Sequence, residues 1–127
     1  MNPVICDTNV FIGLFAGDPV IANELVKIGS SNILLPSIVA MELYSGMSNK
    51  AEMQQMTKKL KHYNILHLNE QASDKSLELL FQFHLSHALK IPDALIGGMA
   101  LIYGLQLYTY NQKDFRFMPN INLYPLP

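Results

Sequence analysis

Residues 92–111 read PDALIGGMALIYGLQLYTYN, and they form the clearest helix–strand unit in the chain. The Pro-Asp pair favours a helix start, and we predict that the helix runs to about Tyr103. Gln106–Thr109 is a short apolar run of the kind that forms a buried strand. Residues 94–112 carry no charge, but glycines and amides make them too polar for a transmembrane helix. We therefore predict a buried helix followed by a buried strand.

The same alternation of β-type runs and helical patterns extends to both ends of the chain. The other predicted strands are Val4–Cys6, Ile33–Leu35, Asn64–Leu68 and, as a possible short edge strand, Ile121–Tyr124. Another predicted helix covers residues 19–28, with Asp18 as its N-cap and Gly29 as its stop. Further helices are predicted over 36–45 and 51–62, with a long helix from Asn69, its N-cap, to about residue 89. This order predicts an α/β domain with a mostly parallel sheet.

Length and composition predict one globular domain over residues 1–127. The chain is 50% hydrophobic and 15% charged with a net charge of -1, which excludes intrinsic disorder. Its single cysteine, Cys6, lies in an apolar run and cannot form an intramolecular disulfide. The N-terminus has no basic segment typical of a signal peptide. We expect a cytoplasmic protein with no membrane partner.

Two features of the predicted helices concern packing. In the long helix, one apolar face is shared by Leu77, Leu80, Phe81, His84 and Ala88. Gly97 and Gly98 weaken the helix that contains them, so we expect them to allow close packing against the sheet or another subunit.

Polar residues with oxygen donors follow the predicted strands. Asp7 comes directly after the first strand, Glu42 lies in the helix after the second, and Asp93 begins the helix that follows a long crossover. Asn111 and Asp114 follow the fourth strand. Because the carboxyl ends of parallel strands lie on one side of a sheet, we expect these groups to meet there.

Carboxylates that lie close together raise one another's pKa, and a bound divalent cation removes this repulsion. The candidate ligands are oxygen atoms of Asp, Glu and Asn, with no Cys or His at a matching spacing. Oxygen ligands favour Mg²⁺ or Mn²⁺ over Zn²⁺. The sequence therefore predicts a magnesium or manganese site.

Four segments together resemble the PIN-domain nuclease family, and most closely its VapC-type toxins from toxin–antitoxin pairs. The segments are D-T-N-x-x-I (7–12), P-S-I-x-x-x-E-L (36–43), P-D-A-L-I-G-G-M-A-L (92–101) and T-Y-N-Q-K-D-F (109–115). They occur in the family's order and spacing and span nearly the whole chain. The resemblance implies a three-layer α/β/α domain and an endoribonuclease that requires Mg²⁺ or Mn²⁺.

The resemblance also implies roles for individual residues. Asp7, Glu42 and Asp93 match the family's three metal-site acids, with Glu42 as a ligand or as the base that orients the attacking water. Many relatives have Asp where this chain has Asn111, which leaves open whether one or two metals bind. Asp114 can replace the missing charge, and both residues would serve the second metal or the scissile phosphate.

Supporting residues and partners follow from the same comparison. Thr8 and Asn9 are expected to orient Asp7 by hydrogen bonds. Without the four candidate acids, the chain has six acidic residues against nine basic ones, a net charge of +3. Lys113 and Arg116 flank the predicted site and are possible RNA contacts. The family further implies an RNA substrate, a small antitoxin that inserts a segment near the site, and a homodimer.

Other interpretations remain open at this stage. Asp7 and Asp93 are also ordinary capping and first-turn residues, and Asn111 and Asp114 are also ordinary turn residues. Two further functions are a catalytically silent PIN-like module that binds proteins and a nuclease that acts on DNA. Tyrosine rings at 44, 108 and 110 are candidates for base stacking, although core packing explains each equally well.

Overall fold

The computed structural model describes residues 2–127, which form a central sheet of four strands. The strands are β1 (Val4–Cys6), β2 (Ile33–Pro36), β3 (Asn64–Leu66) and β4 (Gln106–Tyr108). They lie in the order β3-β2-β1-β4, and each neighbouring pair is parallel. Their carboxyl ends therefore lie at one edge of the sheet.

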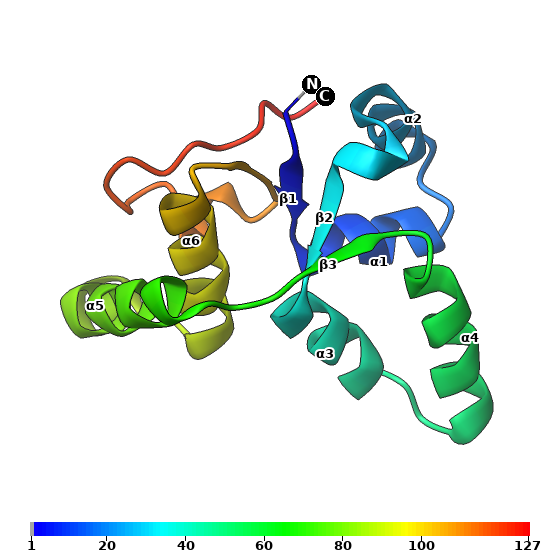
Figure 1. The fold of residues 1–127 in the computed structure, drawn as a ribbon, viewed down its shortest axis with the longest axis horizontal. Helices are drawn as coiled ribbons and strands as arrows, with labels where there is room; N and C mark the ends of the chain where they lie inside the picture. Colours follow the sequence, from blue (N-terminus) through cyan, green and yellow to red (C-terminus); the bar gives the residue numbers. More distant parts are fainter. Residues whose placement is uncertain (1) are drawn as a thin grey trace.

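Helices cover both faces of this sheet. Residues 2–127 contain α1 (Thr8–Phe15), α2 (Pro19–Ile28), α3 (Ser37–Ser45), α4 (Lys50–Leu60), α5 (Glu70–His87) and α6 (Ile91–Tyr103), with the short 3₁₀ helices η1 (Ser30–Asn32) and η2 (Gln112–Asp114). Figure 1 shows α5 and α6 on one side of the sheet and α1, α2 and α4 on the other. The predicted three-layer α/β architecture with a parallel sheet is confirmed.

β1 is one of the two inner strands, and its register with β4 positions the residue that follows it. Cys6 at the end of β1 lies opposite Tyr108 of β4, and the Asp7 N–H donates to the Tyr108 carbonyl at 3.0 Å. All three residues of β1 are buried, and β2 pairs with its other edge. Asp7 therefore lies near the middle of the carboxyl edge.

Two predicted helix starts are confirmed by their caps. The Asp18 side chain accepts a hydrogen bond from the Val20 N–H at 2.9 Å, and Gly29 ends α2 with a φ of 89° that favours glycine. Asn69 caps α5 by accepting from the Ala72 N–H at 2.8 Å. These local signals are strong because each one satisfies a backbone group that the helix leaves unpaired.

Helix α1 was not predicted. The sequence favours a turn after Asp7, whereas the structure has an eight-residue helix with Asp7 as its N-cap. Val10 and Phe11, which are adjacent, are both fully buried. A helix of two turns is too short to show a clear period of 3.6 residues, so its pattern is easily missed.

Element boundaries elsewhere differ from the predictions by at most two residues. The proposed C-terminal edge strand, Ile121–Tyr124, is wrong. Residues 121–124 contribute one isolated bridge, in which Leu123 lies beside Leu107 of β4. Two hydrogen bonds surround it, from Leu107 N–H to the Asn122 carbonyl and from Tyr124 N–H to the Leu107 carbonyl. Prolines at 119 and 125 bound this segment and limit its pairing.

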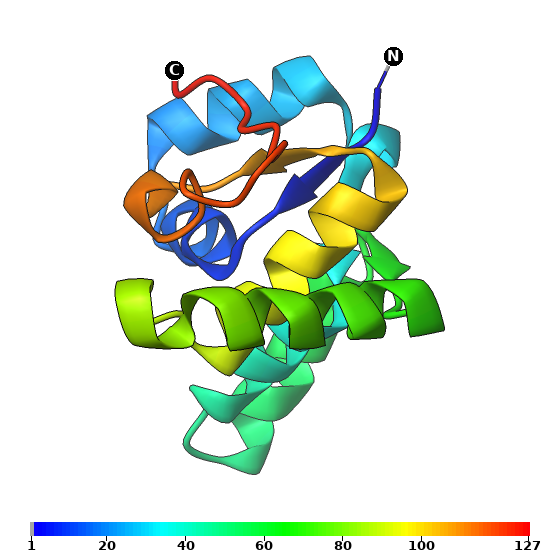
Figure 2. The ribbon, with the colours of Figure 1, turned by 90° about the vertical axis from the view of Figure 1, so that its left-hand side faces the viewer.

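The apolar face predicted for α5 is not the face that packs on the core. Its buried residues are Ala72, Ser76 and Leu79, whereas Phe81 is 94% exposed. Figure 2 shows α5 lying across α6, and small residues at 72 and 76 allow this close crossing. Helix-on-helix contact therefore determined the buried face more strongly than hydrophobicity did.

The close packing predicted for Gly97 and Gly98 is confirmed, but the partner is neither the sheet nor another subunit. A methyl group on Gly98 would collide with Ser76 Oγ and lie 2.9 Å from the Ala72 carbonyl oxygen. A methyl group on Gly97 would collide with the Met118 sulfur. Both glycines thus bring α6 against α5 and the C-terminal segment.

Helix hydropathy bears on membrane insertion. Among residues 2–127, no single helix is both long and apolar enough to cross a bilayer. Helices α1 and α2 together reach that length and composition, but a bend of 117° separates them. The apolar helix α6 has only 13 residues, and six of them are buried in the core.

Candidate metal centre

Asp7 is the most deeply buried candidate ligand, with 5% of its surface exposed. Its Oδ1 accepts from the Thr8 N–H at 2.7 Å, and its Oδ2 accepts from the Thr109 hydroxyl at 2.8 Å and the Asn9 amide at 3.2 Å. Burial raises the pKa of Asp7, and these hydrogen bonds oppose that rise. The carboxylate is therefore held in one orientation at the end of β1.

Thr109 was not identified from the sequence as a functional residue. It is fully buried, and its hydroxyl also accepts from the Asn9 amide at 3.2 Å and the Asn111 N–H at 3.1 Å. One signal could have found it: in the parallel register, the residue after β4 lies beside the residue after β1. Thr109 therefore links the ends of these two strands through Asp7.

Glu42 reaches the same edge from α3, which follows β2. Its Oε1 accepts a hydrogen bond from the Thr8 hydroxyl at 2.8 Å, and the side chain is half-buried. The predicted supporting residue Thr8 thus contacts both acids, through its N–H to Asp7 and its hydroxyl to Glu42. Neighbouring residues Val39 and Leu43 are buried and fix this face of the helix.

Asp93 lies in the first turn of α6 and is half-buried. Its pKa is raised from 3.8 to about 6, first by burial and then by the negative charges of Asp7, Asp114 and Glu42. Lys90 opposes this rise. Asp93 is therefore close enough to the other three carboxylates to be affected by their charges, although the four come from distant segments of the chain.

The candidate residues around η2 differ in burial and in their contacts with the other acids. Asp114 is half-buried, and its charge raises the pKa of Asp93. Asn111 is exposed, and its backbone N–H donates to the Thr109 hydroxyl. Lys113 and Arg116 are exposed, and neither forms an ion pair within residues 2–127. The structure thus groups Asp114 with the other acids but shows no side-chain contact between Asn111 and them in the described chain.

The donor set fits a hard divalent cation because it consists of carboxylate oxygens that repel one another. The part of the chain that the structure describes contains no three His, Cys, Asp or Glu side chains already arranged to hold a metal ion. Cys6 is buried beneath Asp7, and burial raises the pKa of its thiol to about 12. The oxygen donors Asp7, Glu42, Asp93 and Asp114 are therefore the groups that could hold Mg²⁺ or Mn²⁺.

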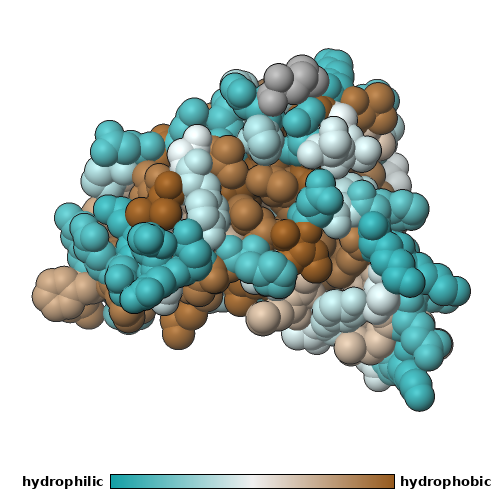
Figure 3. All heavy atoms as spheres, in the orientation of Figure 1, coloured by the Kyte–Doolittle hydropathy of each residue, from teal (hydrophilic) through white to brown (hydrophobic). Residues whose placement is uncertain are grey.

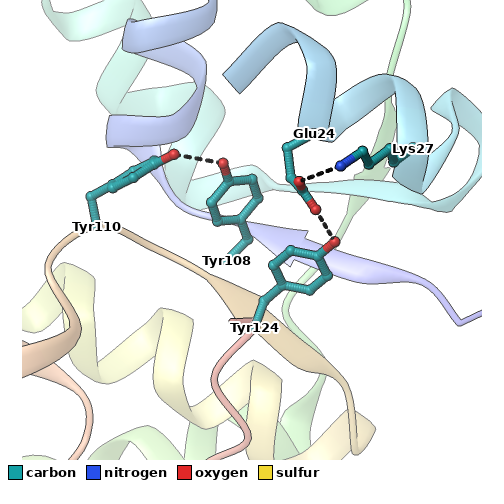
Figure 4. A network of polar contacts seen from close by, with 5 residues as sticks. All are labelled: Glu24, Lys27, Tyr108, Tyr110 and Tyr124. Carbon is teal, nitrogen blue, oxygen red and sulfur yellow. Dashed lines mark hydrogen bonds and ion pairs between the residues drawn. The ribbon is translucent and has the colours of Figure 1, made fainter. Parts of the chain in front are cut away.

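Three tyrosines, Glu24 and Lys27 form a polar network between β4, the C-terminal segment and α2 (Figure 4). The hydroxyl groups of Tyr108 and Tyr110 share a hydrogen bond of 2.7 Å, and Tyr108 is fully buried. Tyr124 donates to Glu24 of α2, which also lies 3.8 Å from Lys27. The bond to Glu24 and burial raise the pKa of Tyr124 to about 12. This network ties β4 and the C-terminal segment to α2.

Comparisons with known proteins place this geometry in a family. The PIN domain model matches residues 4–119, whereas no curated protein sequence matches the chain. A toxin-antitoxin complex from Klebsiella pneumoniae is similar, with 28% identity, a TM-score of 0.76, and coverage of 93% of this chain and 94% of that chain. VapBC2 from Rickettsia felis, bound to a DNA fragment from its promoter, shows 26% identity, a TM-score of 0.78, and coverage of 95% and 96%.

A third similar structure shares the fold alone. It is VapC20 from Mycobacterium tuberculosis, described as a toxin that cleaves the sarcin-ricin loop, with 18% identity and a TM-score of 0.69. The match covers 96% of this chain and 99% of the VapC20 chain. The family match over residues 4–119 carries the assignment. The chain belongs to the PIN domain family, and its resemblance within that family is to the VapC-type toxins.

Proposed function

We propose that this protein is a metal-dependent endoribonuclease and the toxin of a toxin–antitoxin pair. One observation carries the proposal: burial, followed by the negative charges of Asp7, Asp114 and Glu42, raises the pKa of Asp93 to about 6. Such repulsion destabilises the fold unless a cation offsets it, so a site of this kind points to metal binding. Membership of the PIN family, whose members are nucleases, supports the reaction class.

Each acid has a proposed role that follows from its surroundings. Asp7 and Asp93 are direct metal ligands, and Glu42 is a ligand or the base that orients water. Thr8, Asn9 and Thr109 hold Asp7 in place by hydrogen bonds. A bound Mg²⁺ or Mn²⁺ supplies Lewis-acid stabilisation of phosphoryl oxygens and a nucleophilic water at neutral pH. Asn111 and Asp114 serve a second metal or the scissile phosphate.

The proposed substrate is RNA, and exposed cations beside the acids support this choice. Lys113 and Arg116 lie on and after η2, next to Asp114, where they can neutralise phosphates of a bound strand. Few other basic residues surround them, so we expect weak general affinity for RNA and specificity from the shape of the target.

The proposed protein partner is a small antitoxin that inserts a segment beside the acids. A groove of about 590 Å³ lies between α1, α3 and α4, and Glu42 forms part of its wall. Apolar residues of the groove include Phe15 and Met56, and Lys59 lies 5.1 Å from the Phe15 ring centre. A mixed apolar and charged groove next to a catalytic acid suits an inhibitory polypeptide. Similar structures that contain toxin–antitoxin complexes support this proposal.

We also propose a homodimer in the cytoplasm. Helix α5 exposes a stripe of Leu77, Phe81 and Leu85, which are 69%, 94% and 96% exposed. Figure 3 shows apolar residues at the left edge of the molecule, where Figure 1 places α5. A contiguous apolar stripe of this kind is typical of an association surface. A buried, unpaired Cys6 is consistent with a reducing compartment.

Digestion of total RNA tests the nuclease proposal. Purified protein is incubated with RNA and, separately, with DNA in Mg²⁺ or Mn²⁺, with EDTA as the first control. Asp7→Asn and Asp93→Asn should abolish cleavage, whereas Asp74→Asn, at an exposed acid on α5, should not. Cleavage of DNA alone would favour the DNA nuclease. No cleavage together with no metal binding by calorimetry would favour a silent protein-binding module.

A further inference from the structure

Tyr110 lies at the rim of the candidate site and is held by its backbone N–H and by its hydroxyl group. Its N–H donates to Asn9 Oδ1 at 3.0 Å, and its hydroxyl bonds to that of buried Tyr108 at 2.7 Å. Figure 4 shows the two hydroxyl groups pointing toward each other. Of the three tyrosines considered for base stacking, Tyr108 is fully buried and Tyr44 bonds through its hydroxyl to Thr57. Tyr110, in contrast, is 38% exposed.

One side of the Tyr110 ring packs against Tyr108, with ring centres 5.5 Å apart and planes tilted by 49°. The ring also lines a hollow of about 320 Å³ between α1 and α2, together with Asn9, Ile12, Gly13, Asp18 and Ile21. Ile12 is 57% exposed, so its side chain is accessible from this hollow. The hollow therefore offers a fixed aromatic ring opposite an apolar wall.

We infer that this hollow binds an unpaired RNA base that stacks on Tyr110, which makes Tyr110 a specificity-determining residue; this rests on the proposed ribonuclease function. Stacking on an exposed aromatic ring is the general way in which proteins bind single-stranded RNA. Thr109, the preceding residue, donates to Asp7 at 2.8 Å. A base stacked on Tyr110 would thus lie next to the phosphate that is cleaved at the acids.

The polar rim of the hollow favours a base over a phosphate. Asp18 repels phosphate, and its Oδ1 is used by the cap of α2, whereas its Oδ2 makes no hydrogen bond within residues 2–127. That oxygen can accept from an amino or imino N–H of a base. The Asn9 amide already donates to Asp7 and Thr109 and accepts from Tyr110. Stacking therefore supplies affinity, and Asp18 selects bases that present a donor edge.

Binding of a fluorescent RNA tests this inference without relying on cleavage. The probe is a single-stranded RNA hexamer with one 2-aminopurine, whose fluorescence is quenched when it stacks on an aromatic ring. The full-length protein, Tyr110→Phe and Tyr110→Leu are titrated in Mg²⁺ and in EDTA. Both variants lose the hydroxyl bond to Tyr108, so their comparison isolates the ring. Val26→Ser, at an apolar residue of α2 that is 80% exposed and does not line the hollow, is the control.

We expect Tyr110→Phe and Val26→Ser to bind within about twofold of the wild type, and Tyr110→Leu to bind about tenfold more weakly with no quenching. Thermal unfolding by circular dichroism checks that each variant is folded. Ile12→Ser changes an exposed residue on the opposite wall and should also weaken binding several-fold, which keeps the test valid if Tyr110→Leu fails to fold.

Equal RNA affinity and equal quenching for Tyr110→Phe and Tyr110→Leu would overturn the inference and favour a polypeptide as the ligand of the hollow. Absence of RNA binding by the wild type would overturn it too. Cleavage of total RNA by the same preparations tests the proposed function separately. RNA binding that depends on Tyr110 without any cleavage would support the base-binding subsite and argue against the nuclease. Cleavage with an unchanged KM in Tyr110→Leu would support the nuclease and argue against the subsite.

Discussion

Replacing Asp93 by Asn should stabilise the metal-free protein while it abolishes the proposed activity. Burial and the charges of Asp7, Asp114 and Glu42 raise the pKa of Asp93 from 3.8 to about 6. Each pKa unit corresponds to about 1.4 kcal/mol, so this shift represents about 3 kcal/mol before screening. Because Asp93 is only half-buried, solvent screening reduces this energy. We expect Asp93→Asn to raise the free energy of unfolding by about 1 to 2 kcal/mol.

The sign of the pH dependence follows from the direction of the shift. A carboxyl group whose pKa is higher in the folded than in the unfolded state destabilises the fold as it ionises. The stability of the wild type should therefore fall as the pH rises from about 4 through about 6, whereas Asn stays neutral throughout. The difference between variant and wild type should be small at pH 4 and complete above pH 7.

Urea and thermal unfolding in EDTA measure this difference. At pH 7.5, we expect the Asn variant to unfold about 4 to 8 °C above the wild type, since 1 kcal/mol shifts the melting temperature by about 4 °C in a domain of this size. Asp74→Asn, at an exposed acid on α5, is the matched control and should change little. A variant less stable than the wild type at pH 7.5, or a difference independent of pH, would refute the reasoning.

Addition of Mg²⁺ should make the wild type more stable than Asp93→Asn. Binding to the folded state stabilises the wild type by about 2.7 kcal/mol when free metal is at a hundred times its Kd, which exceeds the advantage of about 1 to 2 kcal/mol expected for the metal-free variant. The variant lacks one proposed ligand and should gain much less. If Mg²⁺ or Mn²⁺ raised the melting temperature of both proteins equally, Asp93 would not be a ligand.

Three further predictions concern packing, the support of Asp7 and association. Gly98→Ala should lower the free energy of unfolding by about 1 to 3 kcal/mol, because the added methyl collides with Ser76 and overpacking outweighs the gain in helix propensity; urea unfolding measures it, and a stabilised variant would contradict the packing. Thr109→Val should cost about 1 to 3 kcal/mol and reduce RNA cleavage, while Thr109→Ser retains the 2.8 Å bond to Asp7 and both properties; equal cleavage rates for the two variants would argue against a positioning role. Phe81→Glu should shift the chain toward a monomer in sedimentation experiments with little change in melting temperature, because this residue is 94% exposed; an unchanged sedimentation coefficient would exclude Phe81 from the interface.

Local signals in the sequence were sufficient for the four strands of the sheet, most helix ends and the chain positions of the candidate acids. Asp18 and Asn69 were recognisable as caps because a helix leaves backbone N–H groups that such side chains satisfy at once. The order of strands and helices was sufficient for a parallel sheet. From that sheet alone, Asp7 and Asp93 were expected at one edge, and the structure places their charges within reach of each other.

Tertiary structure decided what depends on partners from distant parts of the chain. The buried face of α5 follows its crossing with α6, so small residues at 72 and 76 are inside and Phe81 is outside. The role of Thr109 requires the β1–β4 register, and the fixed ring of Tyr110 requires both Tyr108 and Asn9. The sequence by itself therefore determined which residues could carry chemistry. Only the fold decided which of them touch, because contacts between distant segments leave no periodic trace in the sequence.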